Sequence, residues 1–277
     1  MGAGEPVAAR EPAVAAVRWL LDRGAQALIV VGDGPATGPV KAGTTGSFAG
    51  FGVPRLVTLG PARAEATEAT RMTEATGTSE VPAPTLPLSL SVGAWLLSAA
   101  GVPRPGAPVV GGFTISADTS PEQAAGYGTR LGDVADRVAM LVMGDGSARR
   151  TPKAPGGFDE RAEAFDASVA TALAAGDPAG LLALDPALGR ELLAAGRASW
   201  QVLAGAADAA LTRMNAAKSD HLDGTQPADN ADNQAPRPNS PSGLCRSVVN
   251  KPFRSYVTYD DAPYGVGYLV ATWERGV

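Results

Sequence analysis

The stretch Val138-Ala-Met-Leu-Val-Met143, followed by Gly144-Asp-Gly-Ser-Ala-Arg-Arg150, decides how the rest of this chain is interpreted. Six consecutive apolar residues indicate a strand that is buried on both faces, because a strand with one wet face would alternate apolar and polar residues. The glycines that follow predict a loop. We therefore expect a central strand of a parallel sheet that delivers a loop to one edge of the sheet.

An earlier segment repeats this arrangement. The apolar run Ala27-Leu-Ile-Val-Val31 leads into Gly32-Asp33-Gly34, so a buried strand and a Gly-Asp-Gly turn occur twice. In open α/β sheets, ligands bind outside the carboxyl ends of the strands, where glycine lets a backbone approach closely. We expect the two turns to share one edge of the sheet and to form a crevice for a ligand.

The bulk composition indicates one soluble domain spanning 1–277. The chain has 277 residues, is 45% hydrophobic and contains 34 Gly and 23 Pro, which predicts a packed core with many turns. A net charge of −5 argues against a nucleic-acid binder or a partner of anionic membranes. The single cysteine, Cys245, cannot form an internal disulfide, and no signal peptide or membrane-spanning run is recognised. The expected compartment is the cytoplasm.

Helical and strand patterns alternate along the chain and predict an α/β fold. The expected strands are 27–31, 53–59, 108–116, 138–143, 253–259 and 264–273, and a loop is expected over 35–52. The expected helices are 12–24, 86–100, 121–137, 159–175 and 198–211, with short helices starting at Asp177-Pro178 and Asp185-Pro186. Strand 108–116, the next helix and strand 138–143 form a parallel crossover pattern. The predicted architecture is a three-layer α/β/α sandwich with a mainly parallel or mixed central sheet.

Two segments have too few apolar residues to be held in a core. Residues 62–85 are a low-complexity mixture of Ala, Thr, Glu and Pro, and residues 214–250 are rich in Asp, Asn, Pro, Gln and Ser. We predict a mobile excursion and a disordered insertion, respectively, because neither can offset the entropy cost of ordering. The only histidine, His221, falls in the predicted insertion together with Cys245, so both are expected to be exposed.

Several phrases resemble a known family. They are Leu-Val-Met-Gly-Asp-Gly-Ser-Ala-Arg-Arg at 141–150, Lys-Ala-Pro-Gly at 153–156, Phe-Asp at 165–166, Trp-Gln-Val-Leu-Ala-Gly at 200–205 and Ala-Pro-Tyr-Gly-Val-Gly-Tyr at 262–268. Together they resemble the actinobacterial class III extradiol ring-cleavage dioxygenase-like (LigB-like) domains, over about residues 25–60 and 84–277 apart from the polar insertion. The resemblance implies a phosphorylase/hydrolase-like α/β/α fold.

The same resemblance implies a site that this sequence does not reproduce. In the true enzymes two histidines and a glutamate hold ferrous iron, and a further histidine is the acid/base. The first ligand follows a strand that precedes the start of this chain, the second position falls on Gly34, and the acid/base position falls on Ala148. The resemblance therefore implies a pseudoenzyme with no catalytic residue, metal or cofactor retained from the family.

The candidate ligand-binding residues lie in the two turns and the basic loop that follows the second. They are Gly32, Asp33, Gly34, Gly144, Asp145, Gly146, Ser147, Arg149, Arg150 and Lys153. The basic side chains beside glycine amides suit a carboxylate or phosphate, although a solvated loop is an alternative. The two aspartates either bind a cation or simply stabilise their turns.

We predict that the crevice binds a small anionic molecule or a protein partner, without assigning an oligomeric state. One alternative is a metal-dependent oxidoreductase or hydrolase that uses Asp33 and Asp145. Another is a non-catalytic subunit of a larger assembly. Ser147 is a weak candidate for a nucleophile, because no histidine is available to activate it.

Overall fold

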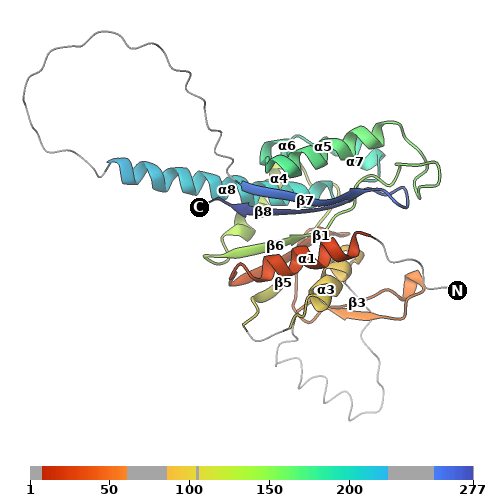
Figure 1. Ribbon diagram of the computed structural model, residues 1–277, viewed down its shortest axis with the longest axis horizontal. Helices are drawn as coiled ribbons and strands as arrows, with labels where there is room; N and C mark the ends of the chain where they lie inside the picture. The colour runs from red at the N-terminus through yellow and green to blue at the C-terminus, as the bar shows by residue number, and fades with distance from the viewer. Residues whose placement is uncertain (1–7, 61–85, 104–105, 224–252, 277) are drawn as a thin grey trace, which may run out of the picture.

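A mixed four-stranded sheet forms the centre of the molecule (Figure 1). The computed structural model describes residues 8–60, 86–103, 106–223 and 253–276, with side chains undescribed over 217–223. Strand β1 (Ala27–Asp33) lies between β5 (Val109–Ile115) and β6 (Val138–Val142) and is parallel to both. Strand β2 (Gly38–Val40) pairs antiparallel with β5 at the edge. The predicted α/β class with a mixed sheet is confirmed.

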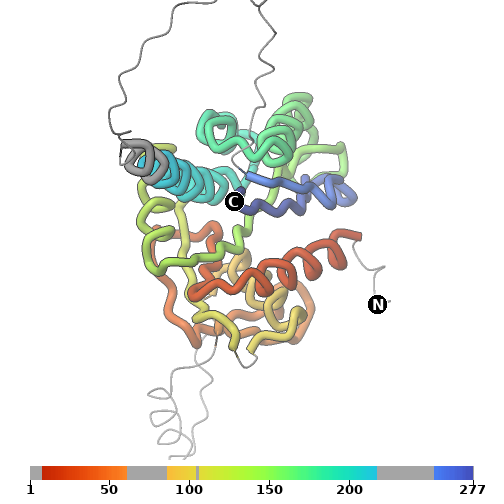
Figure 2. Tube along the Cα trace, turned by 60° about the vertical axis from the view of Figure 1, so that its left-hand side comes forward, coloured from red at the N-terminus to blue at the C-terminus, as the bar shows by residue number. Residues whose placement is uncertain are grey.

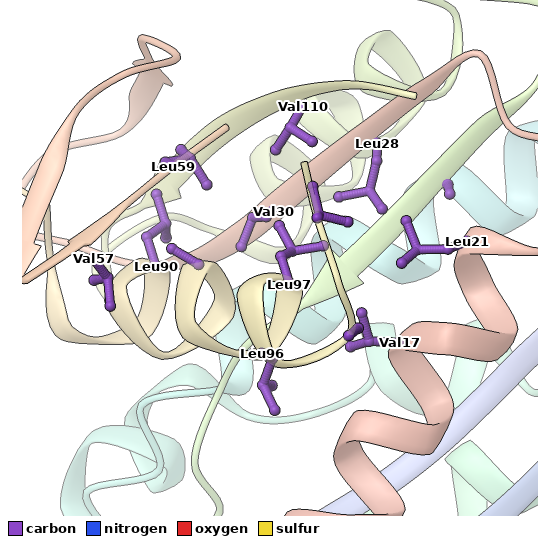
Figure 3. Close-up of a cluster of buried hydrophobic side chains, with 14 of the residues drawn as sticks. Val17, Leu21, Leu28, Val30, Val57, Leu59, Leu90, Leu96, Leu97 and Val110 are labelled. Carbon is purple, nitrogen blue, oxygen red and sulfur yellow. The ribbon is translucent and has the colours of Figure 1, made fainter. Parts of the chain in front are cut away.

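Helices cover both faces of this sheet. Helices α1 (Arg10–Leu21) and α3 (Leu88–Ala99) pack with Leu28 and Val30 of β1, in the core that Figure 3 shows. Helices α4 (Pro121–Gly132) and α8 (Arg197–Asp223) cover the other face, where Ile29 and Val31 are buried. Because successive side chains of a strand point to opposite faces, both sets must be apolar. This explains the unbroken apolar run of β1.

Strand β6 is an edge strand, which corrects the prediction that 138–143 is the central strand. Its residues are mostly half-buried, whereas five consecutive residues of β1 are buried. Strand β1 is its only strand partner within the described part of the chain. Strand β6 is apolar throughout because helices cover both of its faces. Such an apolar run does not indicate that both edges of the strand are paired.

The segment between β1 and α3 also differs from prediction. The expected loop 35–52 contains β2, β3 (Thr45–Ser47) and the 3₁₀ helix η1 (Ala49–Phe51). Of the expected strand 53–59 only β4 (Leu56–Thr58) forms, and it pairs with β3 outside the main sheet. These strands are three residues long, and β2 and β3 contain Gly or Pro, so they lack the periodicity that would reveal them in the sequence.

The C-terminal half adds a second core. Helices α5 (Arg161–Ala175), α6 (Pro178–Leu182) and α7 (Pro186–Glu191) precede α8, and β7 (Phe253–Asp261) pairs with β8 (Tyr268–Arg275). In Figures 1 and 2 this hairpin lies between the α5–α7 group and α1. Its inner side packs with α5 and α8 around Phe165 and Trp200. The predicted helix starts are confirmed, because Asp177 and Asp185 each accept a hydrogen bond from a first-turn amide.

The two predicted polar segments lie mostly outside the described residues. The excursion at 62–85 and the part of the insertion from residue 224 onward, including Cys245, cannot be compared with the structure. The prediction that the insertion starts at residue 214 is wrong, because α8 continues to Asp223 and includes His221. Within the described ranges, no helix combines the length and the apolar character that crossing a membrane requires.

Candidate functional site

The carboxyl ends of β1 and β6 meet at a topological switch point. From β1 the chain goes to β5 on one side, and it later returns through α4 to β6 on the other side. Beyond the ladder, the Met143 amide donates to the Val31 carbonyl at 2.7 Å. Both Gly-Asp-Gly turns therefore leave the sheet at the same end, where the carboxyl ends of β1 and β6 lie. Such a divergence of connections opens a crevice between the two strand ends.

The crevice brings Asp33 and Asp145 within electrostatic reach of each other. Surrounding protein atoms raise the pKa of Asp145, and the negative charge of Asp33 raises it further, although Asp145 keeps exposed surface. Tyr268 of β8 lies nearby, and its pKa is raised first by burial and then by the charge of Asp145. The structure thus adds a phenol to the two predicted carboxylates, and the two carboxylates disfavour an anion between them.

The loop that starts at Gly144 is held by backbone contacts. The Gly146 amide donates to the Gly267 carbonyl at 2.8 Å, and the Gly267 amide donates to the Ser147 carbonyl at 3.0 Å. A Cβ atom on Gly144 would lie 2.3 Å from the Cα atom of Gly196, and the Gly196 amide donates to the Asp145 carbonyl at 2.9 Å. These glycines are needed because the backbones approach too closely for a side chain.

Ser147 is a structural residue of this loop. It is fully buried, and its hydroxyl donates to the Leu192 carbonyl at 2.8 Å and accepts from the Arg149 amide at 3.2 Å. Its own amide donates to Asp166 at 2.8 Å. None of the partners of its hydroxyl is a general base, so the geometry gives no support for a nucleophile.

The three basic residues of the loop have different surroundings. Arg150 forms an ion pair of 3.0 Å with Asp166, whose side chain is only 2% exposed. Burial raises the pKa of Asp166, while the Ser147 amide and Arg150 oppose that shift. Arg149 is half-buried, and its Nε atom has no hydrogen-bond partner among the described residues, although its charge contributes to lowering the pKa of Asp159. Lys153 is exposed. Arg150 is thus committed to a structural pair, which leaves Arg149 and Lys153 as the basic groups of a binding site.

Sequence reasoning missed the residues that support the loop. Asp166, Leu192, Gly196 and the Gly265–Gly267 turn hold it from three separate parts of the chain. Two of these groups lie inside the phrases that carry the family resemblance, namely Phe-Asp at 165–166 and Ala-Pro-Tyr-Gly-Val-Gly-Tyr at 262–268. In the structure, residues from both of these segments contact the loop, so the shared segments were the signal in the sequence that could have identified its supporting residues.

The positions of the family's histidines do not fit an iron site. A Cβ atom on Gly34 would lie 2.8 Å from Thr114 Cγ2, so an imidazole there has no room without repacking. Ala148 offers a methyl group, and its amide donates to the Leu192 carbonyl. Across the described residues, no three His, Cys, Asp or Glu side chains gather in a way that suits a metal ion. The two-histidine, one-carboxylate arrangement therefore has no counterpart at these positions.

Comparison with known proteins adds no family assignment. No family model matches the sequence, and no curated protein matches it. The resemblance to extradiol dioxygenases stays a prediction, and the chemistry of the site rests on its own residues.

Proposed function

We propose that this chain is a binding domain with an extradiol-dioxygenase-like, three-layer α/β/α architecture and without iron-dependent ring cleavage. The helices on both faces of the mixed sheet support the architecture. The crowding of Gly34 by Thr114 supports the loss of iron chemistry, because a ligand at that position would need space for an imidazole. The domain acts by holding a ligand at the strand-end crevice.

The proposed ligand is a small anion held on the basic side of the loop after β6. The observation that carries this assignment is the buried, unpaired Nε atom of Arg149. A buried cationic donor without an acceptor is costly, and a carboxylate or phosphate would supply the acceptor. Lys153 is exposed on the same loop and adds a second positive charge. The anion stays on this side, because Asp33 and Asp145 repel it from the inner crevice.

A second candidate function follows from the approach of the two aspartates. Asp33 and Asp145 would bind a divalent cation, and the domain would be a metal-dependent oxidoreductase or hydrolase. The effect of the Asp33 charge on the pKa of Asp145 supports this alternative, since a cation between the two carboxylates would relieve the repulsion. Two protein carboxylates leave most of the coordination shell to water or substrate, as in many magnesium sites.

Titration of the full chain with inorganic phosphate, citrate and Mn²⁺ separates these candidates. We expect citrate or phosphate to bind, and Arg149→Ala to weaken that binding at least about tenfold through loss of a charge-assisted hydrogen bond. Arg254→Ala is the matched control, because Arg254 is an exposed arginine of β7 outside the loop. Manganese binding that disappears in Asp145→Asn while both anions fail to bind would overturn the proposal in favour of the second candidate.

The loss of ring cleavage is tested by loading the protein with ferrous iron without oxygen and then adding catechol and air. We expect no ring opening above a control with free iron, because the aligned positions are Gly34 and Ala148. Turnover above that control would contradict this part of the proposal, whatever the anion titrations show.

A further inference from the structure

A groove lined mainly by apolar residues, with Asp136, Arg137, Arg213 and Arg275 also in its lining, runs along the edge of β6 that does not face β1. The groove has a volume of about 420 Å³, and all five residues of β6, 138–142, line it. A cavity over one face of a strand is lined by alternate residues, because successive side chains point to opposite faces. Consecutive residues therefore show that the groove follows the strand edge, where backbone N–H and C=O groups are presented.

Strand β8 borders the opposite side of the groove. Leu269, Ala271, Thr272, Trp273 and Arg275 line it, and they again include neighbouring positions along the strand. The other edge of β8 is paired with β7, and Figure 1 shows β8 between β7 and β6. Two strand edges thus face one another across the groove, and neither has a strand partner there within the described part of the chain. Open edges of this kind are templates for another strand.

Helices α1 and α8 line two further sides of the groove. Ala16, Trp19 and Leu20 of α1 line one side, and small residues of α8, including Ala207 and Ala210, line another. A strand placed between β6 and β8 would therefore be covered on both faces. Such strands are apolar at nearly every position.

We propose that this groove binds an extended, apolar polypeptide segment as an added strand between β6 and β8, joining the two sheets. Backbone hydrogen bonds to both edges would provide affinity, as in other cases of strand addition. The sequence of β6 is compatible with such an addition, because its unbroken apolar run suits a strand that is covered on both faces.

The occupant is a segment from outside these 277 residues. The parts of the chain without a described structure, 1–7, 61–85, 104–105, 224–252 and 277, contain no more than two consecutive apolar residues. A strand covered by helices on both faces needs a longer apolar run, of about five residues. The partner chemistry is therefore a short run rich in Val, Ile and Leu, and it does not depend on the anion proposed for the crevice.

Hydrogen exchange of the full chain tests the proposal with a synthetic peptide of about six Val and Leu residues flanked by lysines. We expect β6 amides to exchange faster than β1 amides in the free protein, and to slow by at least about tenfold with the peptide. A peptide of similar hydrophobicity with proline at alternate positions is the control, because proline cannot donate to the ladder. It should give no protection.

Variants of the groove complete the test. Ala207→Trp should fill the groove and abolish protection, whereas Ala167→Trp, at an exposed position of α5, should not. Circular dichroism checks that each variant is folded, and Ala210→Trp replaces the first variant if it is not. Three results would each overturn the proposal: equal protection by the proline peptide, β6 amides as protected as those of β1 in the free protein, or no protection by the apolar peptide at millimolar concentration.

Discussion

Strands β1 and β6 have similar apolar sequences and end in the same Gly-Asp-Gly turn, but their surroundings differ. Strand β1 has a parallel neighbour on each side and is almost fully buried. Strand β6 has one neighbour and borders a groove. An apolar run therefore indicates cover on both faces of a strand and carries no information about pairing at its edges.

The two turns are also held differently. The turn after β1 packs against side chains, because Cβ atoms on Gly32 and Gly34 would meet Ser89 and Thr114. The turn after β6 packs against the backbones of Gly196 and Gly267. Side chains can adjust by rotation, whereas backbone held in a network adjusts little. We therefore expect the second turn to tolerate less change, even though its strand is the less buried one.

Truncating one leucine in each strand gives the largest expected difference. Leu28 of β1 is fully buried, whereas Leu141 of β6 is half-buried and lines the groove. We expect Leu28→Ala to lower the free energy of unfolding by about 3 kcal/mol, and Leu141→Ala by about 1 kcal/mol. Urea unfolding measures both values. Equal losses would show that β6 is as well packed as β1, and the comparison would fail.

Adding a methyl group to the second turn should have an intermediate effect. Gly144→Ala places a Cβ atom 2.3 Å from the Gly196 backbone, and we expect the free energy of unfolding to fall by about 1–3 kcal/mol. Gly50→Ala is the matched control, because no heavy atom lies within 4 Å of its added Cβ atom. Unfolding curves that place Gly144→Ala beside the control would contradict the close packing of the loop on Gly196.

Neutralising Asp145 should have the smallest effect, and one that depends on pH. The Asp145 carboxyl binds its proton more tightly in the folded state than in the unfolded state, because its pKa is raised in the fold. Wild-type protein should thus lose stability relative to Asp145→Asn as pH rises from about 4 through the raised pKa, and the difference should then stay constant. Solvent screening keeps this difference in the free energy of unfolding small. Unfolding of both proteins over a pH series checks the sign, and a gap that widens toward acid pH would contradict it.

The sequence predicted the parts of the fold that periodicity and capping encode. The run at 27–31 forms as expected, and so do the helix starts at Pro121, Pro178 and Pro186, because their signals are local. The edge position of β6 and the short strands β2 and β3 depend on which segments meet in space, and local pattern does not report this. The ion pair of Arg150 with Asp166 also depends on which segments meet in space, because it joins a loop to a helix. Arg150 was predicted to bind a ligand, but in the structure it holds the loop in place.

The pKa of Asp145 reports whether β1 and β6 bring Asp33 and Asp145 together at one crevice. NMR titration of the Asp145 carboxyl should give a raised pKa in the wild-type protein. In Asp33→Asn the pKa should fall, yet stay above its ordinary value, because burial is the larger cause of the shift. An Asp145 pKa that is unchanged by Asp33→Asn would contradict the account, since it would place the two turns too far apart to form one site.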